Sequence, residues 1–145
     1  MEYPTLEDAL VHEVWRQDLS AVQRLLASGA NPNTPGGNWS SAIACAGEND
    51  ETGDIIRVLL SAGAQINIQD SYGQTPLHIA IDMAIDGSIQ CGRDTINWSV
   101  VGILLDLGAD PTIPDTRGRT AYDWVLAYGE NARDSFDEFI RLRSQ

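Results

Sequence analysis

The residues best suited to catalysis in this chain of 145 residues are two aspartates four positions apart. At this spacing Asp82 and Asp86 would lie on one face of a helix. Two carboxylates can act as general acid and general base only where buried neighbours shift the pKa of one of them. Asp82 and Asp86 lead into a polar segment, so we expect a solvated helix face and no catalytic pair.

The other residues that could bind a metal or attack a substrate lack the spacing that such chemistry needs. Cys45 and Cys91 belong to no Cys/His cluster with zinc spacing. Asp70, Asp110 and Asp115 do not have the spacing of a calcium loop. The chain contains no G-x-S-x-G, H-E-x-x-H or P-loop motif. We therefore expect no catalytic residue, no bound metal and no cofactor.

A repeated spacing indicates which elements position these side chains. Three Gly-Ala dipeptides close leucine-rich runs, and twelve residues after each glycine stands a Ser or Thr. The pairs are Gly29 and Ser41, Gly63 and Thr75, and Gly108 and Thr120. Glycine is favoured just after the end of a helix, and a hydroxyl residue is favoured as the N-cap of the next. A fixed distance between these signals predicts stacked helical repeats.

The third of these units carries the most specific motif. Residues 73–80 read G-Q-T-P-L-H-I-A, and an L-L-x-x-G-A run follows. This pattern resembles the ankyrin repeat, and the resemblance covers essentially the whole chain. It implies an all-α helical solenoid of about 3.5–4 repeats with short hairpin turns between repeats. It also implies that His78 forms hydrogen bonds within and between repeats, and that Asp70 and Asp115 cap turns.

The resemblance divides the chain, a single domain over residues 1–145, into four units. They span about residues 5–37, 38–71, 72–116 and 117–145, and the last has the polar outer face of a C-terminal cap. The third unit takes 33 residues from Thr75 to Gly108, about twelve more than the family's period allows. The excess lies near residues 86–99, between the two helices of the unit. We expect it to protrude, with the second helix beginning near Asn97.

Charge limits the class of partner. The formal net charge is −12, and every basic residue other than the two histidines is an arginine. A strongly acidic surface repels nucleic-acid phosphates and anionic membranes, so we expect neither as a partner. It favours a basic protein through electrostatic steering. The chain shows no secretory signal and no stretch of ~20 apolar residues, and we expect a cytoplasmic protein.

Ankyrin-repeat proteins bind partners with the tips of their hairpins and the exposed side of their first helices. Transferred by position, the candidate partner-binding residues on the tips are Trp39, Tyr72, Gln74 and Arg117, and those on the first helices are Glu48, Asp82 and Asp86. At the position of Trp39 the other hairpins have Gly73 and Gly118, so the shape of the first hairpin departs from the pattern. Tyr, Trp and Arg dominate binding hot spots, and Trp39 could instead pack on the stack.

These observations predict a non-enzymatic, monomeric protein that binds one basic protein partner. Small acidic ankyrin proteins occur among bacterial toxin-immunity proteins, and this chain resembles that kind of molecule, so an inhibitor or immunity-type role is the first hypothesis. A scaffold or regulator of a cellular or host pathway is the alternative. An enzyme with its site in the 86–99 insertion and a subunit that self-associates through that insertion are rivals from other classes.

Overall fold

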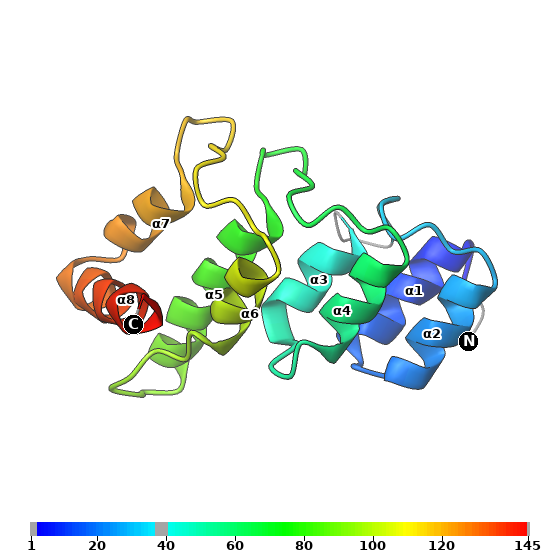
Figure 1. Ribbon diagram of the computed structural model, residues 1–145, viewed down its shortest axis with the longest axis horizontal. Coiled ribbons are helices and arrows are strands. Elements are labelled where there is room, and N and C mark those ends of the chain that lie inside the picture. The colour runs from blue at the N-terminus through cyan, green and yellow to red at the C-terminus, as the bar shows by residue number, and fades with distance from the viewer. Residues whose placement is uncertain (1–2, 37–40, 145) are drawn as a thin grey trace.

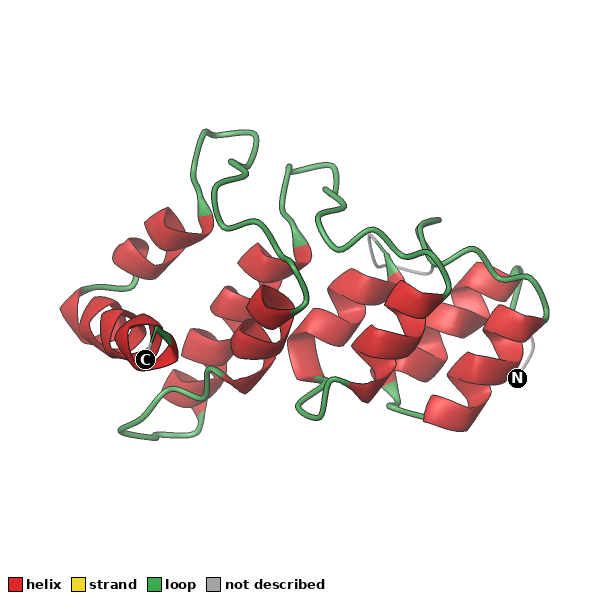
Figure 2. Cartoon of the chain, in the orientation of Figure 1, coloured by secondary structure: helices red, strands yellow, loops and turns green. Residues whose placement is uncertain are grey.

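The computed structural model describes residues 3–36 and 41–144, and within these ranges the chain folds into helices joined by turns and loops (Figures 1 and 2). The helices are α1 (Leu6–Trp15), α2 (Leu19–Ala27), α3 (Ala42–Asn49), α4 (Asp54–Ser61), α5 (Pro76–Gln90), α6 (Ser99–Asp106), α7 (Ala121–Ala127) and α8 (Glu130–Arg143). The inner helices α1, α3, α5 and α7 stack side by side, and α2, α4 and α6 form a second layer that packs against α1, α3 and α5 (Figure 1). The predicted all-α stack of helix pairs is confirmed.

The three Gly-Ala glycines occupy equivalent helix ends. Gly29, Gly63 and Gly108 have φ angles of 101°, 98° and 104°, which are in the region that only glycine adopts without strain. The alanine after each is buried, and its amide bonds back to the helix, as in Ala64 N to Leu59 O at 2.9 Å. The repeated ends therefore arise from the same local geometry in each unit.

Hydroxyl side chains begin the inner helices, as the spacing predicts. Ser41, Thr75 and Thr120 each accept a hydrogen bond from the amide three residues later. Thr5 does the same for α1. Each cap satisfies one of the backbone donors that a helix start leaves without a partner.

Asparagine side chains in the connections hold successive repeats in register. The amide group of Asn33 donates to Gly63 O at 2.9 Å and accepts from Gln65 N at 2.8 Å. The next connection repeats this contact, because Asn67 accepts from Asp110 N at 2.9 Å. These bonds link neighbouring Gly-Ala turns, so the connections must keep a constant length for the helices to stack.

The insertion in the third unit is only partly a loop. Residues 86–90 continue α5, which extends to Gln90, so the loop is confined to residues 91–98. It protrudes at the edge of the stack opposite the hairpins (Figure 1). Asn97 Oδ1 accepts from the Ser99 amide at 2.9 Å at the start of α6, close to the predicted start. Trp98 is 7% exposed and belongs to the core.

Candidate functional site

The hairpins before α5 and α7 form one edge of the molecule (Figure 1). In the first, Asp70 Oδ1 accepts from the amides of Tyr72 and Gln74, both at 2.9 Å. In the second, Asp115 Oδ1 makes the same two bonds, to the amides of Arg117 and Arg119. Both aspartates therefore cap turns, as the resemblance implies, and the turns present the side chains between them outward.

The two hairpins are joined at their tips. Thr116 donates from both its amide and its hydroxyl to Tyr72 O, each at 3.0 Å. The Tyr72 side chain is 68% exposed, Arg117 is exposed and Gln74 is half-buried. Trp39 lies outside the described residues, so its packing or exposure stays a prediction.

His78 is part of the framework. Its Nδ1 lies 2.9 Å from Thr75 Oγ1, and its Nε2 lies 3.0 Å from Arg119 O in the next repeat. The side chain is buried and packs edge-on against Trp124. Both ring nitrogens are used within the protein, so His78 joins repeats as the resemblance implies.

Five residues on or at the ends of the inner helices make up what we call the inner-helix face. Trp15, Met83 and Tyr128 are exposed, and Glu48 and Asp82 are half-buried. The Asn49 side chain, next to Glu48, donates to Trp15 O, and the Tyr128 hydroxyl donates to Asp82. These contacts connect α1 with α3 and α5 with the end of α7.

Two carboxylates of this face interact across a repeat boundary. Burial raises the pKa of Glu48 to about 7, and the negative charge of Asp82 adds to the effect. Burial, followed by the hydrogen bond to Asp82, raises the pKa of Tyr128 above its ordinary value, and the charge of Asp86 contributes. Within the described ranges, no ion pair includes Glu48, Asp82 or Asp86. No ion pair of the described residues therefore neutralises these carboxyl groups, and its raised pKa leaves Glu48 only partly ionised near neutral pH.

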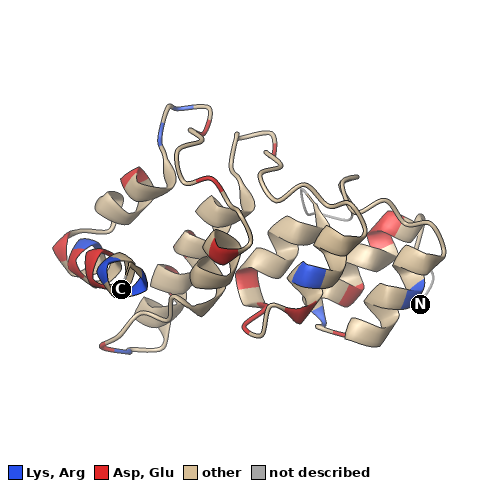
Figure 3. Ribbon diagram, in the orientation of Figure 1, with Lys and Arg blue, Asp and Glu red and all other residues tan. Residues whose placement is uncertain are grey.

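The distribution of arginine strengthens this asymmetry. The sequences of α1, α3, α5 and α7 contain Asp and Glu but no arginine. Figure 3 shows basic positions on the hairpin before α7 and along α8. On α8, Arg133 and Arg141 pair with neighbouring acids. The inner helices thus contribute acids and no arginine, and the basic side chain that lines a pocket together with Asp82 and Tyr128 is Arg119, from the hairpin before α7.

The sequence analysis grouped Asp82 with Asp86 and did not predict the electrostatic interaction between Glu48 and Asp82. Asp86 instead accepts a hydrogen bond from Gln90 at 2.7 Å. A signal for the true pair was present, since Glu48 and Asp82 each follow the N-cap residue of their helix by seven positions. Equivalent positions of stacked repeats lie side by side.

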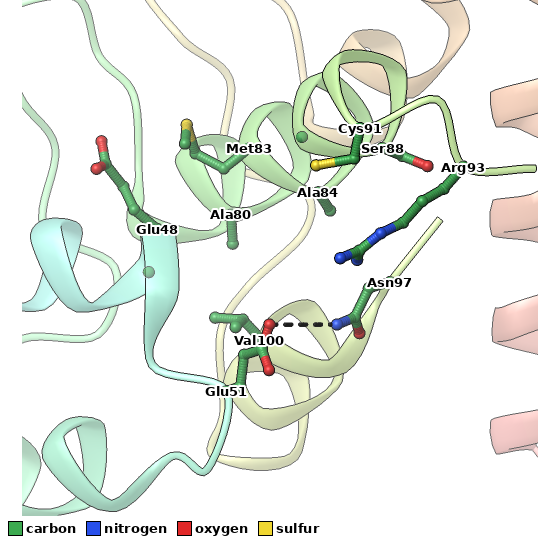
Figure 4. Close-up of a pocket in the computed structure, with 12 residues that line it drawn as sticks. Glu48, Glu51, Ala80, Met83, Ala84, Ser88, Cys91, Arg93, Asn97 and Val100 are labelled. Carbon is green, nitrogen blue, oxygen red and sulfur yellow. Dashed lines mark hydrogen bonds between the residues drawn. The ribbon is translucent and has the colours of Figure 1, made fainter. Parts of the chain in front are cut away.

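A groove of about 160 Å³ lies between the second and third units, next to Glu48 (Figure 4). Its walls come from the end of α3, the turn before α4, the extended part of α5 and the insertion loop. Cys91 lies at its rim as an exposed free thiol. Cys45 is buried nearby, where burial and then the charge of Glu48 raise the pKa of its thiol to about 12.

Two further observations bear on partners. Among the described residues, no helix has both the length and the apolar character needed to cross a membrane. No group of three or more His, Cys, Asp or Glu side chains in the described ranges is arranged to hold a metal ion.

Comparison with known proteins identifies the class to which this fold belongs. A family model described as ankyrin repeats (3 copies) matches residues 10–115. This chain belongs to the ankyrin-repeat family. Ankyrin repeats form modules for protein–protein interaction, and members of the family are typically binding scaffolds without enzymatic activity.

Relatives come from several kinds of organism. An ankyrin repeat protein of Acanthamoeba polyphaga mimivirus is 25% identical over 128 residues, which cover 80% of this chain and 22% of the relative. The E3 ubiquitin-protein ligase KEG of Arabidopsis thaliana is 28% identical over 85% of this chain and 7% of its own length. The ankyrin repeat and LEM domain-containing protein 1 homolog of Caenorhabditis elegans is 40% identical over 55% of this chain and 9% of its own. The chain therefore spans less than a quarter of these relatives.

Proposed function

We propose that this protein is a non-enzymatic binding module that engages one basic protein partner through the inner-helix face and the hairpin tips. The observation that carries the proposal is the charge of the inner helices, which contain carboxylates and no arginine. Glu48 and Asp82 repel each other when both are ionised, and an arginine or lysine of the partner placed between them would reduce this repulsion. Such a charge pair also speeds association.

Aromatic and sulfur-containing side chains around the acids supply the apolar part of the proposed interface. Trp15 is 53% exposed, and Tyr72, Met83 and Tyr128 are exposed as well. Side chains of these types are enriched in protein interfaces. A mixture of large apolar contacts and unneutralised charge is the composition expected of a specific, steered interface.

A catalytic role has less support. His78 uses both ring nitrogens for bonds to Thr75 and Arg119. Ser88, at the groove, donates its hydroxyl to Thr95 O at 2.7 Å. Neither residue therefore has the free nitrogen or hydroxyl that a general base or nucleophile must present to a substrate.

The small acidic stack suits an inhibitor or immunity-type protein that covers a basic surface of its target, acting as a cytoplasmic monomer. The second candidate is a scaffold or regulator of a cellular or host pathway. The size of the relatives favours this second role, because their ankyrin segments are parts of much longer chains. Both roles use the same surface, and the identity of the captured partner distinguishes them.

The test is a capture experiment with matched baits. The wild-type protein and a Glu48→Gln/Asp82→Asn variant are immobilised and exposed to extract, and bound proteins are identified by mass spectrometry. A Glu130→Gln/Asp134→Asn variant removes the same number of carboxyl groups from α8, away from the proposed site. The proposal requires a basic protein that the wild type and the α8 variant retain and the inner-face variant loses. Equal retention by all three baits would contradict it.

A further inference from the structure

A second pocket, separate from the groove, lies between the third unit and the C-terminal unit. Its volume is about 230 Å³. Its lining residues come from α5, α7 and the hairpin before α7 (Figure 1), and they are Asp82, Arg119, Trp124, Ala127 and Tyr128. Trp124, Ala127 and Tyr128 are three and four positions apart, so they share one face at the end of α7. The pocket thus combines a carboxylate of one repeat with two aromatic side chains of the next.

The positive charge of Arg119 is neutralised within the protein. Its Nη2 and Nε atoms each lie 3.1 Å from Asp115 Oδ2, and the Asp115 side chain is only 2% exposed. The guanidinium lies over the Trp124 ring, 5.2 Å from its centroid, and Trp124 Nε1 donates to the same oxygen of Asp115 at 3.0 Å. Arg119 and Asp115 are therefore a neutral pair held against the tryptophan. The remaining charge of the pocket is that of Asp82, which forms no ion pair within the described ranges.

Asp82 uses one of its two carboxylate oxygens within the protein. The Tyr128 hydroxyl donates to Asp82 Oδ1, and Asp82 Oδ2 accepts no hydrogen bond from the residues that the structure describes. Burial, then this hydrogen bond and the charges of Asp82 and Asp86 raise the pKa of Tyr128, so the hydroxyl stays protonated near neutral pH and continues to donate. The same two charges make the potential beside Tyr128 negative, which attracts a cation.

A single available oxygen favours an ammonium over a guanidinium. A guanidinium binds a carboxylate best through two parallel hydrogen bonds, one to each oxygen, and Tyr128 already bonds to one oxygen of Asp82. The ammonium of lysine is a compact point charge on a flexible four-carbon stem, so one oxygen is enough for it. Cations are also attracted to the faces of tryptophan and tyrosine rings, and the stem of a lysine packs on apolar surface, which Trp124 and Ala127 supply here.

Size and composition limit the occupant further. A cavity of roughly 150 Å³ accommodates a molecule the size of benzene, so a pocket of about 230 Å³ accepts one long side chain. The chain itself contains no lysine. A lysine in this pocket must therefore come from another protein and not from a second copy of this chain.

We propose that this pocket binds a lysine side chain of the partner, with the ammonium at Asp82 Oδ2 and the aliphatic stem on Ala127 and Trp124. The inference rests on the proposed function, because Asp82 and Tyr128 belong to the inner-helix face. It adds a requirement that a general acidic surface would not impose, since such a surface would accept arginine equally well. The hydrogen bond from Tyr128 to Asp82 is the feature that sets the preference.

Three small probes test the proposal without the natural partner. Nα-acetyl-lysine amide, Nα-acetyl-arginine amide and the uncharged Nα-acetyl-norleucine amide are titrated separately into the ¹⁵N-labelled protein, and chemical shifts are followed by NMR. The indole NH of Trp124 and the amide of Ala127 should shift in a saturable way with the lysine probe, whereas the indole NH of Trp98 should not. The lysine probe should bind about threefold more tightly than the norleucine probe, as a partly exposed ion pair provides, and more tightly than the arginine probe.

Variants assign the roles of the two polar groups. Asp82→Asn should abolish the advantage of the lysine probe over the norleucine probe. Tyr128→Phe keeps the ring and frees Asp82 Oδ1, so the arginine probe should then bind at least as tightly as the lysine probe. Glu130→Gln is the matched control, because it removes a carboxylate two residues after Tyr128 that does not line the pocket, and both preferences should persist in it.

Two kinds of result would overturn the lysine assignment. One is a Trp124 indole that does not shift with the lysine probe. The other is a lysine preference that Tyr128→Phe leaves unchanged, or that Glu130→Gln reduces as much as Asp82→Asn does. Such a failure leaves the proposed function standing, because that depends on the capture experiment with intact partners. Conversely, a pocket that prefers the lysine probe in a protein that captures no basic partner would contradict the proposed function alone.

Discussion

The indole Nε1 of Trp98 donates a hydrogen bond to Ser135 Oγ on α8 at 2.9 Å. Trp98 is the last residue of the insertion, and its ring also packs against Phe136 and Phe139 at centroid distances of 5.1 and 5.9 Å. The insertion thus contributes the side chain against which the last helix docks. The segment expected to protrude from the stack is tied at one end to its C-terminal cap.

Replacing Trp98 should therefore destabilise the whole protein. Trp98→Ala should lower the free energy of unfolding by about 3 kcal/mol, the lower end of the range for deleting a buried aromatic ring. Urea denaturation followed by circular dichroism measures the loss. Ile89→Ala is the control, because Ile89 is in the same segment but 63% exposed. Equal stability of the two variants would show that α8 does not depend on the insertion.

His78 should matter for stability and little for binding. His78→Ala removes bonds to Thr75 and Arg119 O and leaves buried groups without partners, which costs about 1–3 kcal/mol each. Thermal unfolding should shift downward while the affinity for a captured partner stays within about twofold at a temperature where the variant is folded. A variant with normal stability and lost binding would assign His78 to the interface instead.

The pKa of Glu48 predicts an unusual dependence of stability on pH. A carboxyl group whose folded pKa is raised from 4.5 to about 7 binds a proton more tightly in the folded state. The stability that the protonated Glu48 contributes is therefore lost as the pH rises from 4.5 to about 7. Glu48→Gln should flatten the decline in unfolding free energy between pH 4.5 and 7 and should be more stable than the wild type at pH 8.

The control for this pH experiment is Glu138, whose pKa is shifted in the opposite direction to that of Glu48. The hydrogen bond from Arg141 lowers the pKa of Glu138, so its contribution is present above the unfolded pKa and lost as pH falls. Glu138→Gln should not flatten the decline toward neutral pH. Urea titrations at several pH values measure both slopes. A Glu48→Gln variant with the wild-type slope would mean that Glu48 is ionised like an exposed glutamate.

The hairpin-tip residues should act on affinity alone. Tyr72→Ala and Trp39→Ala should each weaken partner binding by about 1–3 kcal/mol, as exposed aromatic anchors do. The Tyr72 variant should keep the wild-type melting temperature, because its side chain is 68% exposed. Calorimetric titration and thermal melts of the same samples separate the two effects. Unfolding of Trp39→Ala would place that side chain in the stack.

Much of the fold could be predicted because the repeat signals are local. Gly29 with Ser41, or Gly63 with Thr75, marks a helix end and the next helix start within a single turn region, so their spacing is visible without knowledge of the packing. The insertion was located by length alone, and its continuation of α5 was missed. The end of α5 did have a local signal, because Gly92 follows the C-cap residue Cys91 with a φ angle of 62°, as Gly29 follows the C-cap of α2.

The candidate site was less predictable because its contacts cross repeat boundaries. Asp82 lies beside Glu48 and accepts a hydrogen bond from Tyr128. Both of these neighbours are far from Asp82 in the sequence. The position of Tyr128 depends on how α7 stacks after the lengthened third unit. The hydrogen bond between Trp98 and Ser135 also depends on how the units stack after the lengthened third unit. Helix periodicity groups Asp82 with Asp86, whereas stacking of repeats groups it with Glu48.

The most direct test of the acidic inner-helix face is the association rate of the captured partner, measured by stopped flow at low and at physiological salt. Charges on the inner-helix face should speed encounter, and screening over ~8–10 Å should reduce the advantage. The account predicts that Glu48→Gln/Asp82→Asn slows association at low salt and has a smaller effect at physiological salt, while the Glu130→Gln/Asp134→Asn control remains near the wild type. Identical association rates and salt dependence for all three proteins would contradict it.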